Sequence, residues 1–265
     1  MSLSDEELER YARHIVLREV GGAGQAKLKA ARVLVIGAGG LGSPVILYLA
    51  AAGVGTIGVV DFDHVSLSNL QRQIAHRTAD IGRLKTQSAS DAIRAVNPHV
   101  AIEAHPIRLD VDNALDLIAR YDIIADGSDN FATRFLVADA CFFARRTLVS
   151  AAVSEFSGQL STFKPFEAGR PCYRCLFGAP PPAGTARSCS ETGVLGAAAG
   201  VMGTLQALEI IKEIVGAGDS MTGRLLIYEA LETRFRTVIL HRDPACPLCG
   251  ESPSIAALSH RADYN

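Results

Sequence analysis

The stretch from Val33 to Val60 constrains the fold more than any other part of the chain, because its 28 residues include no charged side chain. A membrane-spanning helix needs only about 20 apolar residues, so length alone leaves that possibility open. The stretch is interrupted, however, by Pro44 and by seven glycines, at positions 37, 39, 40, 42, 53, 55 and 58. Glycine clusters of this kind mark turns. We therefore expect a strand, a helix and a second strand in a buried βαβ unit, and no membrane segment.

The same alternation continues to about residue 152. Strands are predicted at 33–36, 56–60, 100–104, 122–126 and 147–151, and helices at 42–52, 85–96, 113–120 and 130–144. Strands that alternate with helices form parallel sheets with helices on both faces. The expected fold class is therefore α/β, a Rossmann-like, doubly wound and mainly parallel sheet.

The pattern changes after Ala152. Segments 159–164, 224–230 and 234–240 read as strands without crossover helices, so we expect them to extend the sheet in antiparallel fashion, and 193–215 reads as a buried helix. The chain thus divides into an N-terminal helical arm (1–30), a nucleotide-binding Rossmann-like region (31–152) and an antiparallel-strand, loop and metal-binding region (153–265), all in one continuous domain. The tail from Ser252 to Asn265 is expected to be poorly ordered.

The arm begins with a helix signal. Ser4 and Glu7 form a capping box, and apolar residues follow at helical spacing, which predicts one helix with a single apolar face made of Leu8, Tyr11, Ala12, Ile15 and Val16.

Composition excludes two classes of partner. The chain has 26 Lys and Arg against 28 Asp and Glu, a net charge of −2, so it lacks the basic footprint of a nucleic-acid-binding protein. Aromatic residues make up 6% and there is no Trp, which disfavours stacking on single strands. The start of the chain is acidic and has no apolar segment like that of a signal peptide. We expect a cytoplasmic protein with no membrane partner and with reduced thiols.

A glycine motif points to a nucleotide. Gly37, Gly39 and Gly42 satisfy G-x-G-x-x-G between a predicted strand and a predicted helix, and Asp61 follows Gly37 by 24 residues. Backbone N–H groups in such a loop face a phosphate, and a carboxylate at the end of the next strand accepts hydrogen bonds from ribose hydroxyls. Taken alone, the motif favours a dinucleotide, and glycines that serve only close packing are the alternative.

The residues after Asp61 favour ATP over NAD. Arg72 and Lys85 follow within the next 24 positions, and a triphosphate needs cationic side chains because charge develops on the leaving pyrophosphate. Asp126 and Asp129 lie at the end of a further strand, at the ligand-binding edge of the sheet. One of the two carboxylates is a candidate ligand for Mg²⁺.

Four of the six cysteines are spaced as two pairs, Cys172-x-x-Cys175 and Cys246-x-x-Cys249. Four thiolates are the ligand set of a closed structural Zn²⁺ site, and a redox dithiol is the alternative. Cys141, within a predicted apolar helix, is expected to be a core residue. Cys189 lies in a segment expected to be a mobile loop, where Arg187 would favour its thiolate; it is either a nucleophile or an exposed thiol without an essential role.

These motifs together resemble the MoeB/ThiF (HesA/MoeB/ThiF) family of ubiquitin-activating-enzyme-like adenylyltransferases, over nearly the whole chain. The segments that carry the resemblance are RYARHIVL from Arg10, GAGGLG from Gly37, DFDHVSLSNLQRQ from Asp61, Asp129-Asn130, CYRC from Cys172 and GVMGTLQALE from Gly200. The resemblance implies ATP-dependent adenylation of the C-terminal Gly-Gly carboxylate of a small ubiquitin-like sulfur carrier protein, with release of pyrophosphate.

The resemblance also implies roles for individual residues. Gly40 would approach the phosphates, Asn69, Arg72 and Lys85 would meet the triphosphate, Asp129 would bind Mg²⁺, and Arg13 would reach the ATP of the partner subunit in a homodimer. Cys189 matches a loop cysteine that joins covalently to the carrier in ThiF-like proteins. The catalytic set is thus Arg13, Arg72, Lys85, Asp129 and Cys189. The expected ATP-binding set is Gly37, Gly39, Gly40, Gly42, Asp61, Ser68, Asn69, Leu70, Gln71, Arg72, Lys85, Asp129 and Asn130.

The carrier and the class of function stay open at the level of sequence. The carrier is not identified, so thiamine, molybdopterin, thiolated tRNA and sulfur-containing secondary metabolites are all possible destinations. The chain ends at Asn265, and we expect it to lack the rhodanese-like domain that some relatives append, so sulfur would come from a separate persulfide donor.

An NAD-dependent oxidoreductase with its pyrophosphate on the Gly37–Gly42 loop is the alternative function, and a non-catalytic scaffold is a third.

Overall fold

The computed structural model describes residues 3–181, 193–259 and 262–264. The helices are α1 (Asp5–Arg10), α2 (Ala12–Ile15), α3 (Gly21–Ala30), α4 (Gly42–Ala52), α5 (Lys85–Val96), α6 (Ala114–Ile118), α7 (Phe131–Ala144), α8 (Tyr173–Phe177) and α10 (Gly196–Val215), with short 3-10 helices at Leu67–Asn69, Thr78–Asp80 and Ala262–Tyr264. The strands are β1 (Arg32–Ile36), β2 (Thr56–Val60), β3 (Ala101–His105), β4 (Ile123–Asp126), β5 (Thr147–Ser154), β6 (Ser157–Phe163), β7 (Arg224–Glu229) and β8 (Arg234–Ile239). Within these ranges no helix is long and apolar enough to cross a membrane.

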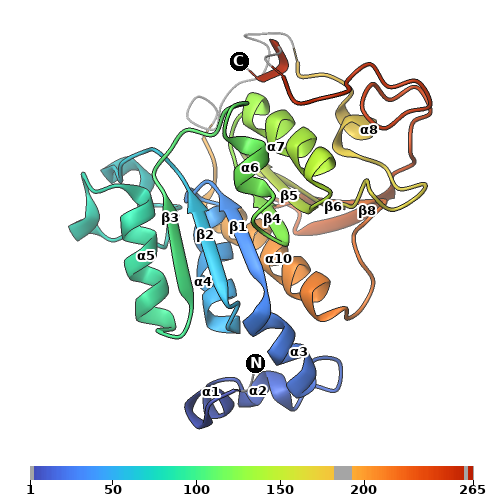
Figure 1. The fold of residues 1–265 in the computed structure, drawn as a ribbon. Coiled ribbons are helices and arrows are strands. Elements are labelled where there is room, and N and C mark those ends of the chain that lie inside the picture. The colour runs from blue at the N-terminus through green and yellow to red at the C-terminus, as the bar shows by residue number, and fades with distance from the viewer. Residues whose placement is uncertain (1–2, 182–192, 260–261, 265) are drawn as a thin grey trace.

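The strands form one eight-stranded sheet in the order β3-β2-β1-β4-β5-β6-β7-β8 (Figure 1). The pairs among β1 to β5 are parallel, and β6, β7 and β8 extend the sheet in antiparallel fashion. The predicted α/β class, a doubly wound parallel sheet with an antiparallel extension, is therefore confirmed. From β1 the chain builds first toward β2 and β3 and later, on the other side, toward β4 and β5. The gap between the carboxyl ends of β1 and β4 is thus the switch point where such folds bind ligands.

Each face of the sheet is covered by helices, as Figure 1 shows. Along β1, Val33 and Val35 join the core cluster under α4, α5 and α10, whereas Leu34 and Ile36 join the cluster under α6 and α7. Alternate residues of a strand point to opposite faces, so a strand buried on both faces must be apolar throughout. This requirement explains the uncharged run that begins at Val33.

The turn from β1 to α4 depends on two glycines. Gly37 has a φ of +88°, in the region that side-chain-bearing residues avoid. A Cβ on Gly42 would lie 1.8 Å from the Gly37 carbonyl oxygen. The glycine motif therefore holds the first turn of α4 directly against the end of β1, which places backbone groups of residues 37–41 at the carboxyl edge of the sheet.

The N-terminal arm differs from its prediction. The Ser4–Glu7 capping box is present, but the expected single helix is broken at Tyr11 into α1 and α2, and Leu8 and Val16 are 46% and 75% exposed. Tyr11 is buried with its ring against Gly53, and its hydroxyl accepts a hydrogen bond of 2.7 Å from the side-chain amide of Asn97. This long-range contact turns Tyr11 inward and interrupts the helix, so the predicted apolar face is not formed.

The C-terminal tail is also more ordered than predicted in its described part. Ile255 is buried beside Cys172 and Cys246. The Tyr264 hydroxyl donates a hydrogen bond of 2.6 Å to Asp139 of α7, and Asp263 pairs with Arg174 of α8. The expectation of a poorly ordered tail is therefore wrong for these residues, because the tail packs against α7 and α8.

Candidate active site and metal centre

A cavity of about 710 Å³ opens at the carboxyl ends of β1, β2 and β4. It lies at the switch point of the sheet, and the N-terminal arm lies at the opposite end of the strands (Figure 1). The sequence-predicted residues that line the cavity are Gly37, Gly39, Gly40, Asp61, Arg72, Lys85, Asp129 and Asn130. The fold thus brings together a glycine loop, two cations and two carboxylates that are spread over more than 90 residues of sequence.

Asp61 is tied to the glycine loop. Its Oδ2 accepts a hydrogen bond of 2.9 Å from the Ala38 N–H, and its Oδ1 accepts one of 2.9 Å from the Asp63 N–H. The side chain is only 9% exposed. Each carboxylate oxygen keeps a further lone pair, so Asp61 remains able to accept hydrogen bonds from a bound ligand while its position is fixed.

The two cations reach the cavity from different elements. Lys85, the first residue of α5, is buried, and its Nζ lies 2.8 Å from Asp63 and 4.0 Å from Asp61. Arg72 follows a 3-10 helix, and its Nη1 donates a hydrogen bond of 3.0 Å to the Ser68 carbonyl. A Cβ atom placed on Gly40 would lie 3.4 Å from the aliphatic part of the Arg72 side chain. Arg72 therefore lies directly over the glycine loop.

The structure separates the roles of the two candidate magnesium ligands. Asp126 is fully buried and accepts hydrogen bonds from the Ser128 N–H, the Ser128 hydroxyl and the Ser150 hydroxyl. It organises the turn between β4 and α7. Asp129 is exposed to the cavity, and within the described ranges it has no ion pair or hydrogen bond. Of the two carboxylates, Asp129 is the one available to a metal ion.

Several predicted residues do not reach the cavity wall. Gly42 packs against Gly37, and the Asn69 side chain accepts a hydrogen bond from the Ser66 N–H within its own turn. The others outside the wall are Ser68, Leu70 and Gln71. Arg13 is exposed on α2, at the opposite end of the strands, and Cys189 lies outside the described residues.

The cavity wall also includes polar residues that the sequence did not single out, among them Gln73, Arg108, Asp110, Asp112, Arg134 and Tyr264. Arg134 is 9% exposed and donates a hydrogen bond of 2.6 Å to the Ser128 carbonyl. Gln73 lies two residues from Gln71 in a polar run that the sequence did place near the phosphates. Nothing in the local pattern marks Tyr264, because contacts with residues distant in sequence, such as Asp139, bring it to the site.

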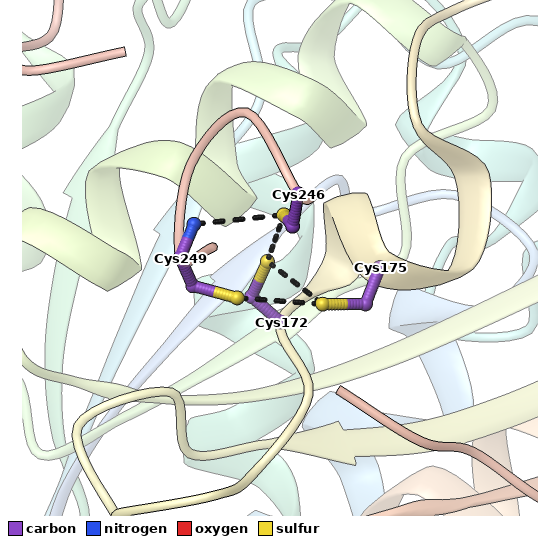
Figure 2. Close-up of side chains that lie close together, drawn as sticks. All are labelled: Cys172, Cys175, Cys246 and Cys249. Atoms are coloured by element: carbon purple, nitrogen blue, oxygen red, sulfur yellow. Dashed lines mark hydrogen bonds between the residues drawn. The ribbon is translucent and has the colours of Figure 1, made fainter. Parts of the chain in front are cut away.

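The second site is a cluster of four cysteines. Figure 2 shows Cys172 and Cys175 from the start of α8 facing Cys246 and Cys249 from a C-terminal turn. All four sulfur atoms lie within 4.8 Å of one another, and three pairs are 3.8, 3.5 and 3.3 Å apart. In a tetrahedral zinc–thiolate site, sulfurs at 2.3 Å from the metal are about 3.8 Å apart. The cluster therefore fits a zinc ion.

The surroundings of the cluster favour a thiolate at Cys175, whereas hydrogen bonds to Cys175 and burial raise the pKa values of the Cys172 and Cys249 thiols. Hydrogen bonds from Cys172 and Cys249, together with a 3.4 Å bond from the Asp243 N–H, lower the pKa of the Cys175 thiol. The Cys249 N–H donates in the same way to the Cys246 sulfur at 3.5 Å. Backbone donors to sulfur disperse thiolate charge. Cys141, by contrast, is buried in α7, and burial raises the pKa of its thiol, which confirms the predicted core role.

We expect Cys246→Ser to lower the zinc content of the purified protein from about one ion per chain to a small fraction, because serine does not replace a thiolate ligand. Elemental analysis after gel filtration measures this. Cys141→Ala is the matched control, since it removes a buried thiol outside the cluster and should keep the zinc. Equal zinc content in both variants would contradict the assignment.

A buried ion pair connects this cluster to the cavity. Arg174, between the two cysteines of α8, is 2% exposed and donates three hydrogen bonds of 2.7 to 3.0 Å to Asp139, which is fully buried. Burial alone would lower the pKa of Arg174, but these hydrogen bonds raise it. Burial and the bond to Asp139 likewise raise the pKa of Tyr264, which therefore stays a phenol. The cysteine cluster, α7 and the cavity wall are thus held by one network.

Comparisons with known proteins identify the family of the chain. The model of the ThiF family matches residues 11–248. The chain is 48% identical over 257 residues to "Sulfur carrier protein adenylyltransferase" of Thermus thermophilus, covering 96% of this chain and 95% of that protein. It is 51% identical over 258 residues to "Adenylyltransferase and sulfurtransferase MOCS3" of Bos taurus, covering 97% of this chain but only 56% of that protein. It is also 46% identical to "SAMP-activating enzyme E1" of Haloferax volcanii, over 95% and 92% of the two chains.

Among solved structures, E. coli MccB is similar with a TM-score of 0.81 at 22% identity, covering 100% of this chain and 77% of that chain. MccB solved with ATP is similar with a TM-score of 0.78 at 22% identity, covering 91% and 74% of the two chains. At this level of identity the similarity supports the fold alone.

Proposed function

Since the chain belongs to the ThiF family, we propose that it is an adenylyltransferase that uses ATP to activate the C-terminal carboxylate of a small ubiquitin-like sulfur carrier protein ending in Gly-Gly. The relatives named above as adenylyltransferases, which include a sulfur carrier protein adenylyltransferase, support the reaction and the substrate class. The chain spans little more than half of the MOCS3 relative, so the sulfurtransferase part of that name is not carried over.

The observation that carries the proposal is the combination of groups in the cavity. The glycine loop, the Asp61 carboxylate, the cations Arg72 and Lys85 and the carboxylate of Asp129 line the same space. Two phosphates are held by a loop and a helix terminus alone. A triphosphate, whose leaving pyrophosphate gains charge during the reaction, needs cations such as Arg72 and Lys85.

In the proposed complex, Asp61 accepts hydrogen bonds from the ribose, Gly37, Gly39 and Gly40 approach the phosphates, and Arg72 and Lys85 neutralise the polyphosphate. Asn69 of the neighbouring turn and Asn130 stay candidates from the sequence. Asp129 would hold Mg²⁺ by its carboxylate oxygens, and the ion would neutralise charge on the phosphate oxygens.

The proposed reaction needs no protein nucleophile. A carboxylate oxygen of the carrier forms a bond to the α-phosphorus of ATP, the bond from that phosphorus to the bridging oxygen breaks, and pyrophosphate leaves with the electron pair. The protein contributes positioning and charge neutralisation. An NAD-dependent oxidoreductase is the alternative that the glycine loop and Asp61 also fit, but it gives no role to Arg72, Lys85 or Asp129.

We further propose a homodimer in which Arg13 completes the site of the partner subunit. Arg13 is exposed on α2, at the end of the strands opposite the cavity, so it is too remote to act on its own site. Val16 and Leu17 on the same arm are 75% and 50% exposed. Large exposed apolar side chains favour an interface with a second copy.

A mixing experiment tests the shared site. Arg13→Ala and Asp129→Ala should each be inactive alone. In an equal mixture half of the dimers are mixed, and one of their two sites is intact, so about a quarter of wild-type activity should return. Subunits are exchanged under mild denaturant and assayed by adenylate formation. Activity that stays at the level of the separate variants would contradict a site shared between subunits.

Other parts of the proposal rest on sequence. Sulfur would come from a separate persulfide donor, the zinc cluster would be structural, and the protein would act in the cytoplasm. Cys189, outside the described residues, stays a candidate nucleophile for the sulfur-transfer step.

The proposal is tested by incubating the protein with ATP, Mg²⁺ and purified Gly-Gly-ended carriers, followed by intact-mass analysis. One carrier should gain the mass of an AMP moiety, and a carrier without its last glycine should not. Thermal shifts give an independent readout, because a ligand that binds the native state raises its melting temperature. Stabilisation by NAD and not by ATP, with no carrier modified, would contradict the proposed function.

A further inference from the structure

His76 contacts the glycine loop from outside the cavity. It lies between β2 and α5 and is only 6% exposed. Its Nε2 is 2.9 Å from the carbonyl oxygen of Ala38, and its Nδ1 is 2.8 Å from the Ser88 hydroxyl. Ser88, on α5, is in turn 2.9 Å from Asp80. A chain of hydrogen bonds therefore runs from α5 to the backbone of the loop.

The chemistry of these groups assigns the proton on Nε2. A carbonyl oxygen only accepts, so Nε2 must carry the hydrogen. In neutral His76 the Ser88 hydroxyl donates its single hydrogen to Nδ1 and gives up its bond to Asp80. If Nδ1 is protonated, it donates to Ser88, whose hydroxyl then donates to Asp80. The bond from Nε2 to Ala38 is present in both states.

The charged groups around His76 are Lys85 of α5, Asp61 at the end of β2 and Asp80. Burial, the largest effect, and Lys85 lower the pKa of His76, against the opposite effect of the hydrogen bond to Ala38 and of the two carboxylates. In either protonation state Nε2 keeps its hydrogen, so the bond to Ala38 does not depend on the charge of His76.

This contact fixes the orientation of one peptide group. In a planar trans peptide the C=O and the N–H point in opposite directions. Because the Ala38 carbonyl points to buried His76, the Gly39 N–H points away from it, toward the cavity that Gly39 lines. Among the described residues the Gly39 N–H has no hydrogen-bond partner. The Ala38 N–H, on the preceding peptide, is held by Asp61 at 2.9 Å.

We propose that His76 is a positioning residue that holds the Ala38–Gly39 peptide with its N–H toward the polyphosphate of the nucleotide. Without this hydrogen bond the peptide is free to rotate, and a carbonyl oxygen turned into the cavity would repel a phosphate. The inference rests on the proposed function, since it assumes a polyphosphate next to Gly39. His76 is thus expected to affect the binding of the phosphates and not the binding of the nucleoside.

Two variants of His76 form a matched pair. Glutamine carries an amide nitrogen at about the position of Nε2 and keeps a donor to Ala38. Asparagine carries its amide at about the position of Nδ1, so it keeps the contact with Ser88 but loses the hydrogen bond to the Ala38 carbonyl. Titration calorimetry with ATP and with adenosine, on proteins whose melting temperatures have been compared, measures both affinities.

We expect His76→Asn to bind ATP about tenfold more weakly than wild type, the size of effect that one lost hydrogen bond to a charged ligand produces, with adenosine affinity unchanged. His76→Gln should bind ATP within about threefold of wild type. Equal affinity of the two variants for ATP, or an equal loss for ATP and adenosine, would overturn the inference, because a merely structural role predicts both.

If His76→Asn does not fold, Ser88→Ala carries the test, because it leaves the imidazole in place but removes the hydroxyl that holds the ring at Nδ1. This variant should bind ATP more weakly than wild type and adenosine equally well. Wild-type affinity for both ligands would overturn the inference. The proposed function fails separately. A wild-type protein that binds no ATP refutes the function, whereas tight ATP binding by every variant refutes only the role of His76.

Discussion

Replacing Asp129 by Asn is expected to reduce adenylate formation by about two to three orders of magnitude, the cost of removing one group that stabilises transition-state charge. Asp129 faces the cavity and has no ion pair or hydrogen bond within the described ranges. Its loss should therefore leave the free energy of unfolding within about 0.5 kcal/mol of wild type. Pyrophosphate release in the presence of carrier measures the first effect, and urea denaturation measures the second.

The matched control is Asp116→Asn. Asp116 is exposed on α6 and does not line the cavity, so the substitution makes the same change in charge without touching the site. It should keep wild-type activity. If Asp129→Asn keeps it too, Asp129 is not a magnesium ligand in the reaction.

The largest effect on stability is expected for Asp139→Asn. Asp139 is fully buried and is the main partner of Arg174, which is 2% exposed. Removing one member of a buried pair leaves an uncompensated charge and costs about 3–5 kcal/mol. Tyr264 would also lose the acceptor of its hydrogen bond. The free energy of unfolding from urea denaturation measures the loss.

Asp263→Asn is the control, because Asp263 is the second carboxylate on Arg174, at 2.8 Å, but is 21% exposed. A partly exposed pair contributes about 0–1 kcal/mol. The two positions share a partner, so the double variant should show coupling between them. Equal small losses for both single variants would contradict the view that the Asp139–Arg174 pair holds α7 and α8 together.

Much of the fold is predictable from local pattern. The predicted strand 56–60 and helix 85–96 coincide with β2 and α5, because apolar periodicity and the Asn97–Pro98 stop signal act over a few residues. Parallel strands bring their carboxyl ends together, so the sequence predicts the glycine loop, Asp61, Arg72, Lys85 and Asp129 at one edge, where they line the cavity. The four cysteines were grouped by spacing and by the chemistry of thiolates.

What the sequence did not reveal depends on contacts between distant polar residues. Tyr11 breaks the first helix through Asn97, which lies 86 positions away. His76 supports Ala38 across 38 positions, and Tyr264 reaches Asp139 across 125. A single buried polar residue has no periodicity, so no local pattern marks it. The residues that position the site are therefore harder to predict than those that line it.

The central claim is that the protein activates a carrier carboxylate with ATP. It is tested most directly by ATP–pyrophosphate exchange, with and without purified Gly-Gly-ended carriers from the same organism. We predict exchange that depends on a carrier, with one carrier far more effective than the others, which would also identify the pathway. No exchange with any carrier, together with stabilisation by NAD, would contradict the account and favour the oxidoreductase.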